Sequence, residues 1–432
     1  MNLKQMAISG TKWTTASTIV IALVSLIKLS VLTRFLAIED FGLMALVNVV
    51  LGFMSLFMDM GLTSAILHKQ NITKNEYSSL YWLNVFFSLT LMLIIMIVSP
   101  FIGDFYNEEQ LPLLLILMSL SLIISATGRQ FKTVKAKNLD FKFIAIVDVI
   151  TSTLSLILAI ILAYLNYGVY AIVYSALLQF SLSNLTYLIS GINSNSIQWH
   201  FKMLETKPFL KIGMYQVGGQ VVNYFNRDID TLIVGKILGA EVLGGYSLAK
   251  QLVFRPTMII NPILSKVAAP TLAKIQHNKN QLKEGYLKIL NIVSSLNFVA
   301  YVLLAILAYP VVLILYGTDF IHIVSIVQIL CIYMYLRSLG NPVGALVTAT
   351  GRTDLEFYWN ILALCVVPLI VYISSFMGVN GIAIGLSLFM LLAFYPFYKL
   401  LISKMISCSF KEYTKATIIN PLILLRLFKN NI

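Results

Sequence analysis

Five positively charged side chains fall inside long apolar stretches of this sequence: Lys28, Arg227, Lys250, Arg255 and Arg337. A charged side chain at the centre of a bilayer costs roughly 2.5–3.5 kcal/mol when it faces lipid, so such residues normally face a partner or a water-filled cavity. Several cations around one cavity attract an anion, and the planar guanidinium of arginine suits the oxygens of phosphate or pyrophosphate. These residues therefore predict an anion-binding cavity within a membrane.

Polar residues recur at helical spacing beside these cations. Around Arg227 they follow steps of four and three residues, which places them along one face of a helix. Similar stripes lead up to Asp59 and include Lys250 and Arg337. The polar residues that we expect to line the cavity are Asn48, Gln216, Gln220, Asn223, Asn261 and Asn341.

Two aspartates near the cations leave a second interpretation open. Asp228 and Asp230 could neutralise Arg227 in a packed interior, and the charges would then be structural. The cations within the apolar stretches outnumber these two acids. That surplus favours an anion-binding cavity over pure pairing.

Membrane-spanning helices are the elements that must position these residues. Hydrophobic residues make up 59% of the 432 residues and charged residues 11%, which is more apolar surface than a soluble protein of this size can hide. A spanning helix needs roughly 20 mostly apolar residues. We predict an all-α polytopic membrane protein of about twelve transmembrane helices, at residues 14–35, 42–67, 79–103, 112–128, 143–164, 168–190, 212–235, 241–268, 286–308, 322–350, 356–376 and 379–402.

Composition and loop length disfavour several other functions. The net charge of +13 is compatible with nucleic-acid binding, but basic residues that flank apolar spans usually set membrane orientation, so we expect no nucleic-acid partner. The three cysteines and four histidines lack metal-ligand spacing, and neither a metal nor a cofactor is expected. No loop between the predicted spans is long enough for a soluble catalytic domain. We therefore expect a protein that is not an enzyme.

Lysine and arginine are distributed unevenly between the predicted loops. With the N-terminus inside, the outer loops hold only Arg34 and Lys236. Because positively charged loops face the cytoplasm, this asymmetry predicts cytoplasmic N- and C-termini. Residues 403–432 combine basic residues with an apolar run too short for another span, so we expect a basic cytoplasmic or interfacial tail.

The sequence contains an internal repeat. The stretch from Arg34 to Leu46 aligns with the stretch from Lys236 to Leu248, and each has a glutamate followed three residues later by a glycine. A second match relates residues 167–172 to residues 377–382. We therefore predict two six-helix lobes, residues 1–205 and 206–402, that form a parallel repeat around a central cavity.

Several segments resemble the polysaccharide transporter (Wzx-type) family of lipid-linked oligosaccharide flippases, especially the branch that includes the colanic acid exporters. The resemblance is carried by residues 33–46, 57–66, 80–84 and 223–249 and extends over most of residues 1–400. It implies the two-lobed fold of the multidrug/oligosaccharidyl-lipid/polysaccharide exporters. In that family a cationic lumen is thought to receive the diphosphate-sugar.

The resemblance implies a flippase of the bacterial cytoplasmic (inner) membrane. Its substrate would be an undecaprenyl-diphosphate-linked repeat unit of O-antigen, capsule or exopolysaccharide, moved from the inner to the outer leaflet by alternating access. H⁺ or Na⁺ would be coupled to transport, with Asp59, Asp228 and Asp230 as candidate ion-coupling residues. Polysaccharide polymerase machinery and the lipid bilayer are the other expected partners.

Two alternatives stay open at this point. A cation-coupled small-molecule efflux transporter of the same fold would favour acidic residues in the cavity. A membrane polysaccharide polymerase would need a large extramembrane loop or an acidic catalytic cluster, and the sequence contains neither.

Overall fold

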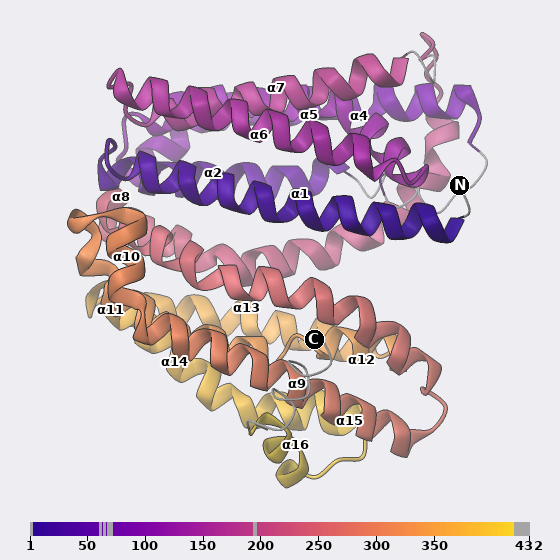
Figure 1. Cartoon of the computed structure of the whole chain (residues 1–432), viewed down its shortest axis with the longest axis vertical. Helices are drawn as coiled ribbons and strands as arrows, with labels where there is room; N and C mark the ends of the chain where they lie inside the picture. Colours follow the sequence, from indigo (N-terminus) through magenta and orange to yellow (C-terminus); the bar gives the residue numbers. More distant parts are fainter. Residues whose placement is uncertain (1–2, 60–62, 64–65, 67–71, 193–196, 419–432) are drawn as a thin grey trace. The chain divides into compact units, whose positions relative to one another are not determined.

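The computed structural model describes residues 3–59, 63, 66, 72–192 and 197–418. Within these ranges the side chains of residues 3–4, 6–8, 59, 211–217, 262–267 and 269 are left undescribed. All regular elements in the described ranges are helices (Figure 1). This confirms the predicted all-α class.

The chain divides into two compact units. Unit 1 comprises Met1–Tyr224, Gly239–Gly244 and Leu315–Gly317, and unit 2 comprises Phe225–Leu238, Gly245–Ile314 and Thr318–Ile432. In unit 1, α5 packs against α2, α4 and α7, while α6 packs against α1 and α7 (Figure 1). The helices of this unit are α1 (Leu3–Leu32), α2 (Ile38–Asp59), α4 (Lys74–Tyr106), α5 (Leu111–Lys137), α6 (Phe141–Tyr164) and α7 (Tyr170–Ile192).

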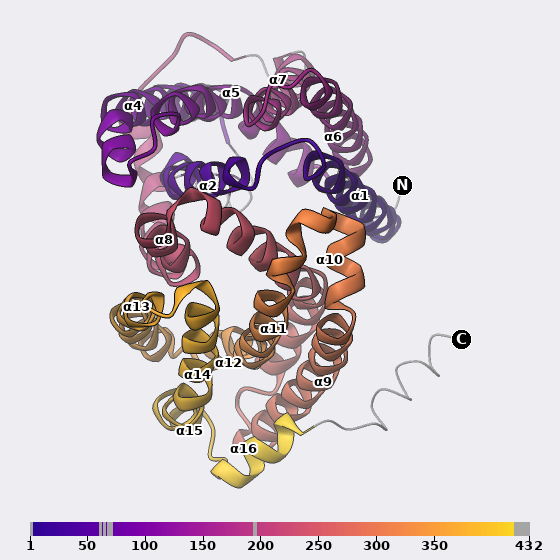
Figure 2. The ribbon, with the colours of Figure 1, turned by 90° about the vertical axis from the view of Figure 1, so that its left-hand side faces the viewer.

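Unit 2 is built around α11, which packs against α9 and α14, and α13 packs on the far side of α14 (Figure 2). Helix α8 (Met203–Lys274) contributes residues to both units. The other elements that follow it are α9 (Lys279–Ile306), α10 (Ala308–Tyr316), η1 (Thr318–Ile323), α11 (Val324–Ser338), α12 (Val343–Thr350), α13 (Thr353–Ser375), α14 (Gly378–Phe397), η2 (Tyr398–Ile402), α15 (Ser403–Met405) and α16 (Phe410–Thr417).

The described residues contain 11 helical segments long and apolar enough to cross a membrane. One of them, Gly218–Asn261, has 44 residues, about twice the length that one crossing needs. It contains a break at Gly239, whose φ of 83° and ψ of 173° are not helical. Glycine reaches such a positive φ without the steric cost that a side chain would add. The segment is therefore a pair of helices, which agrees with the predicted twelve spans.

Another predicted span, residues 322–350, is also interrupted. Helix α11 ends at Ser338, and α12 begins at Val343 with Pro342 as its N-cap residue. A proline supplies no backbone N–H and fixes φ near the helical value, so it suits a helix start. Pro342 therefore begins α12 without adding an unpaired N–H.

Side-chain caps fix the start of several helices. Thr73 and Glu76 form a capping box at α4, and Ser409 and Glu412 form another at α16. In each box the hydroxyl accepts from the backbone N–H of the glutamate, and the carboxylate accepts from the backbone N–H of the cap residue. These bonds satisfy N–H groups that have no partner within the helix.

Part of the predicted tail is folded against unit 2. Helix α16 packs on α9, with Tyr413 fully buried. The backbone carbonyl of Thr417 accepts from Ser294 Oγ at 2.6 Å, and that of Ile418 accepts from Asn291 Nδ2 at 2.7 Å. Residues 419–432 lie outside the described residues.

Two glycines at matching positions of the internal repeat make reciprocal close contacts within unit 1. A Cβ added at Gly42 would overlap the carbonyl oxygen of Ala240, and one added at Gly244 would overlap the carbonyl oxygen of Ile38. Ile38 and Ala240 are themselves equivalent in the repeat. The contact thus has the form expected when a two-fold axis relates two similar segments. Only glycine allows the two backbones to approach this closely.

We expect Gly42→Val and Gly244→Val each to destabilise the protein by about 1–3 kcal/mol, because the added side chain must displace backbone rather than a flexible side chain. The matched control is Gly218→Ala, since a Cβ at Gly218 meets no atom within 4 Å. Thermal unfolding in detergent measures the effect. Valine variants as stable as the control would contradict the contact.

Candidate functional site

Most of the predicted charges of unit 2 lie in one cluster. We define the acid–base cluster as Arg227, Asp228, Asp230, Lys250 and Arg337. The first three lie on the part of α8 before Gly239, Lys250 lies on the part after it, and Arg337 lies in the last turn of α11. The structure thus brings together residues from three helical segments that the sequence could only place on separate faces.

Lys250 is the most fully coordinated cation of the acid–base cluster. Its Nζ donates to Asp230 Oδ1 at 2.7 Å, to the Arg227 carbonyl at 2.8 Å and to Thr231 Oγ1 at 3.1 Å, and Asp228 Oδ1 lies at 3.4 Å. An ammonium has three protons, so these acceptors use all of them. The side chains of Lys250 and Asp230 are 14% and 8% exposed. This ion pair is therefore shielded and ties the two parts of α8 together.

Asp230 has a further buried partner in Tyr246. The Tyr246 hydroxyl donates to Asp230 Oδ2 at 2.5 Å, and the backbone N–H of Thr231 donates to Oδ1 at 2.9 Å. Tyr246 has no exposed surface. Hydrogen bonds to a buried carboxylate offset the cost of removing it from water, so Tyr246 and the Thr231 N–H compensate part of the burial of Asp230.

Arg227 is held differently from Lys250. Its Nε and Nη2 donate to Asp228 Oδ2, both at 2.8 Å. Half of the Arg227 side chain is exposed, against 16% for Asp228. A guanidinium has five N–H donors in a fixed fork. Arg227 thus presents a more exposed positive charge than Lys250 does.

Arg337 is the cation of the cluster without a carboxylate at ion-pair distance among the described residues. Its Nη1 donates to the Tyr333 hydroxyl at 2.6 Å, one helical turn away. Its guanidinium lies 5.8 Å from the ring centroids of both Tyr333 and Phe254. Lys250 Nζ lies 5.9 Å from the same Phe254 ring, which places Arg337 beside the ion pairs of α8. The cluster has three cations and two carboxylates and so carries an excess of positive charge.

Lys28 lies in unit 1 and has hydroxyl partners only. Its Nζ donates to Ser155 Oγ at 3.0 Å and to Ser175 Oγ at 2.8 Å. Each serine hydroxyl donates in turn to a backbone carbonyl, that of Ser175 and that of Ile172. The hydroxyl oxygens therefore act as acceptors toward Lys28, and no carboxylate pairs with it among the described residues.

The remaining predicted cavity residues are more dispersed. Asn341 Nδ2 donates to Asn261 Oδ1 at 2.6 Å, which links the turn after α11 to α8. Arg255 is half-buried and has no ion-pair partner in the described part of the chain. Three further predicted residues are exposed: Asn48, Gln220 and Asn223. The structure does not describe the side chains of Gln216 and Asp59. The existence of one shared cavity thus stays a prediction.

Sequence reasoning missed the partners Tyr246, Tyr333 and Phe254 in unit 2 and Ser155 and Ser175 in unit 1. Tyr333 could have been found, because it precedes Arg337 by four residues and so lies on the same helix face. Serine in a membrane helix is common and gives no comparable signal. No group of three or more His, Cys, Asp or Glu in the described residues could hold a metal ion.

Comparison with known proteins supports the family expected from the sequence. The family described as "Polysaccharide biosynthesis protein" matches residues 31–325. The chain is 28% identical over 414 residues to the lipopolysaccharide biosynthesis protein WzxC of Escherichia coli (strain K12), covering 96% of this chain and 84% of that protein.

Solved structures support the fold. The lipid II flippase MurJ in an inward closed conformation superposes with a TM-score of 0.70 at 16% identity, covering 98% of this chain and 93% of MurJ. An inward-facing multidrug resistance MATE family transporter of the MOP superfamily gives 0.68 at 14% identity, covering 89% and 94%. At these identities the likeness concerns the fold. The sequence relative is named as a lipopolysaccharide biosynthesis protein, and the two solved structures are named as a lipid flippase and a multidrug transporter.

We expect Lys250→Met to destabilise the protein strongly, because it leaves Asp230 buried without its cation. Breaking one side of a buried ion pair typically costs about 3–5 kcal/mol. The double variant Lys250→Met/Asp230→Asn should recover much of this loss. Arg352→Gln, which breaks the exposed pair with Asp354, should change stability by no more than about 1 kcal/mol. Thermal unfolding in detergent compares the variants, and equal stability of the single and double variants would contradict the assignment.

Proposed function

Because this chain belongs to the family of polysaccharide biosynthesis proteins, we propose that it is a flippase for an undecaprenyl-diphosphate-linked oligosaccharide. The oligosaccharide is a repeat unit of O-antigen, capsule or exopolysaccharide. It moves from the inner to the outer leaflet of the bacterial cytoplasmic membrane by alternating access. The N- and C-termini face the cytoplasm, as the distribution of lysine and arginine favours.

The observation that carries this proposal is the excess of positive charge in the acid–base cluster. The Arg337 guanidinium contacts the Tyr333 hydroxyl and the rings of Tyr333 and Phe254. Asp228 and Asp230 act on its charge electrostatically, but no carboxylate of the described residues lies at ion-pair distance from it. Arginine binds diphosphate oxygens through parallel charge-assisted hydrogen bonds. In a low-dielectric site such bonds are stronger than in water. An anionic head group would satisfy Arg337, whereas a small cation would be repelled.

Arg227 is the second arginine that we assign to the head group. Its half-exposed guanidinium can turn toward a diphosphate, while Lys250 remains bound by Asp230. Lys28, which has only hydroxyl partners, is the corresponding cation of unit 1. Arg255 completes the predicted set of cations that receive the diphosphate.

Ion coupling follows from the same contacts. A diphosphate bound to Arg227 competes with Asp228 for the same positive charge. The anion site and the candidate ion site at Asp228 are thus coupled, and each ligand changes the affinity of the protein for the other. Asp230, held by Lys250 and Tyr246, would respond less. Polysaccharide polymerase machinery would take up the product on the outer side.

Arg337→Gln should abolish or strongly reduce export, because it removes the guanidinium that binds the diphosphate and leaves a neutral polar side chain. The measurement is leaflet-resolved accumulation of lipid-linked saccharide in a strain that lacks the chromosomal copy. Membrane abundance of the variant is measured in parallel. Arg337→Lys should retain partial function, since the charge remains but the fork is lost.

The matched control is Arg352→Gln, because Arg352 forms an exposed pair with its near neighbour Asp354. This variant should export as wild type does. Wild-type export by Arg337→Gln at normal abundance would remove the assignment of the anion site. Resistance to small cationic drugs, without any effect on lipid-linked saccharide, would instead establish the efflux alternative.

A further inference from the structure

Four aromatic rings contact one another in series at one end of unit 1. Two of them lie on α4, and two lie on a segment outside the candidate membrane spans. We name this group the aromatic ledge and define it as Trp82, Phe86, Trp199 and Phe201. The rings of Trp82 and Trp199 are stacked with centroids 4.4 Å apart, and Trp82 contacts Phe86, which contacts Phe201 edge to face. Trp199 and Phe201 belong to the connection between α7 and α8. Nothing in the proposed transport cycle uses these residues.

Hydrogen bonds attach this connection to the start of α4. Trp82 Nε1 donates to the Gln198 carbonyl at 3.0 Å, and the Gln198 N–H donates to Ser78 Oγ at 3.0 Å. The Lys202 N–H donates to Ser79 Oγ at 3.1 Å, and Ser79 Oγ donates to Glu205 Oε2 at 2.6 Å. The aromatic ledge is therefore a fixed surface and not a loosely attached loop.

In and beside this connection, two large apolar side chains are more exposed than a pair of polar ones, which is unusual for a loop in water. The polar side chains of His200 and Glu205 pair with each other at 3.0 Å and are only 22% and 23% exposed. The apolar side chains point away from the protein, with Trp199 91% and Leu204 75% exposed. The hydrogen bond from Ser79, followed by that from His200, lowers the pKa of Glu205, so the inner carboxylate stays ionised. A segment that pairs His200 with Glu205 and exposes Trp199 and Leu204 fits an apolar partner.

The aromatic ledge continues directly into the apolar surface of α4. Phe86, Leu93, Ile97 and Phe101 are all exposed at helical spacing, and α4 is a candidate membrane span. Since lipid covers this surface, the ledge lies where the bilayer meets water. Tryptophan is enriched at that level because its ring is apolar and its indole N–H is polar.

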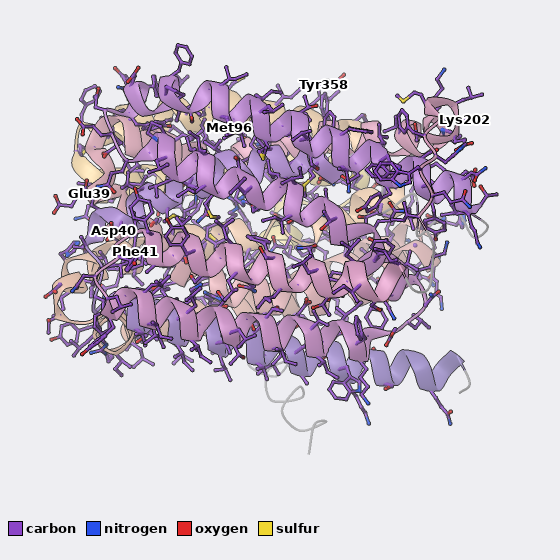
Figure 3. The ribbon with its side chains drawn as sticks, turned by 90° about the horizontal axis from the view of Figure 1, so that it is seen from above. Glu39, Asp40, Phe41, Met96, Lys202 and Tyr358 are labelled. Carbon is purple, nitrogen blue, oxygen red and sulfur yellow. The ribbon has the colours of Figure 1, made fainter. Side chains whose placement is uncertain are left out.

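Basic residues flank the aromatic ledge. Lys202 and Lys207 are both exposed, and Figure 3 places Lys202 at the end of the helices opposite Glu39 and Asp40. On the first turns of α8, Met203 and Leu204 are exposed while Thr206 and Phe209 are buried. An apolar face beside lysines is typical of segments that lie in the membrane interface and bind anionic lipid.

We propose that residues 197–207 form an interfacial anchor that inserts the aromatic ledge among the head groups of an anionic lipid leaflet. Trp199, Phe201 and Leu204 enter the upper acyl region, and Lys202 and Lys207 bind lipid phosphates. The anchor fixes the depth of the α4 end of unit 1 in the bilayer. The proposal does not depend on the transported substrate.

Tryptophan fluorescence tests the anchor. The chain has four tryptophans, so Trp13→Phe/Trp359→Phe leaves only Trp82 and Trp199, both in the aromatic ledge, and adding Trp199→Phe to this double variant isolates the signal of Trp199. The purified protein is reconstituted in vesicles of phosphatidylglycerol and phosphatidylcholine. Lipids brominated near the glycerol should quench Trp199 about twofold more than lipids brominated near the chain ends, as expected for interfacial tryptophan. Aqueous iodide should quench it weakly.

Two further measurements keep the test decisive. If the double variant does not fold, the difference in bromolipid quenching between wild type and Trp199→Phe gives the same quantity. Lys202→Gln/Lys207→Gln should weaken the dependence of quenching on phosphatidylglycerol, by about fivefold in apparent lipid affinity for each lysine. The control Lys279→Gln/Lys288→Gln removes the same charge from exposed sites of unit 2 and should leave Trp199 unchanged.

Strong iodide quenching without bromolipid quenching would overturn the anchor, because Trp199 would then face water. A change of Trp199 fluorescence on addition of soluble oligosaccharide, again without bromolipid quenching, would also overturn it and would make the ledge a sugar-stacking surface. Both outcomes would leave the assignment of the anion site at Arg337 untouched.

Discussion

An ammonium group inside a membrane protein needs an acceptor for each of its protons, and Lys250 finds its acceptors on the neighbouring half of α8. Asp230, the Arg227 carbonyl and Thr231 all lie before the break at Gly239, whereas Lys250 lies after it. The ion pair thus determines how the two halves align. Because water cannot replace these bonds in a shielded site, a shift of the register would leave a buried charge unpaired. The geometry of the acid–base cluster rests on this constraint.

The need for hydrogen-bond acceptors is met differently at each cation. All three ammonium protons of Lys250 have acceptors, and the Nε and Nη2 of Arg227 contact Asp228. Arg337 and Lys28 are solvated by a phenol and by two serine hydroxyls. Neutral acceptors lower the cost of burial without cancelling the charge. Neither residue has a carboxylate at ion-pair distance among the described residues.

The two halves of the repeat make the same backbone contact at a matched glycine but carry different charged residues at matched positions. Gly42 and Gly244 make the same contact with equivalent partners. In the same register Lys28 corresponds to Asp230, and Asn48 corresponds to Lys250. One half of the repeat therefore has an internal ion pair where the other has an uncompensated lysine. Close backbone packing demands glycine in both halves, whereas the charges are free to diverge because each is satisfied within its own surroundings.

Local sequence patterns were enough to predict the all-α class, about twelve spans, the internal repeat and the charged residues within the apolar stretches. These features follow from apolar runs of the length of a bilayer, glycines at matched positions, and polar residues spaced by helical turns. Which cations are paired is visible only in the folded protein. Asp230 forms its ion pair with Lys250 and not with Arg227, which is three residues away in the sequence. Lys28 donates hydrogen bonds to serines on α6 and α7. Pairing depends on which helices meet and at what height, and that is set by packing between segments far apart in the chain.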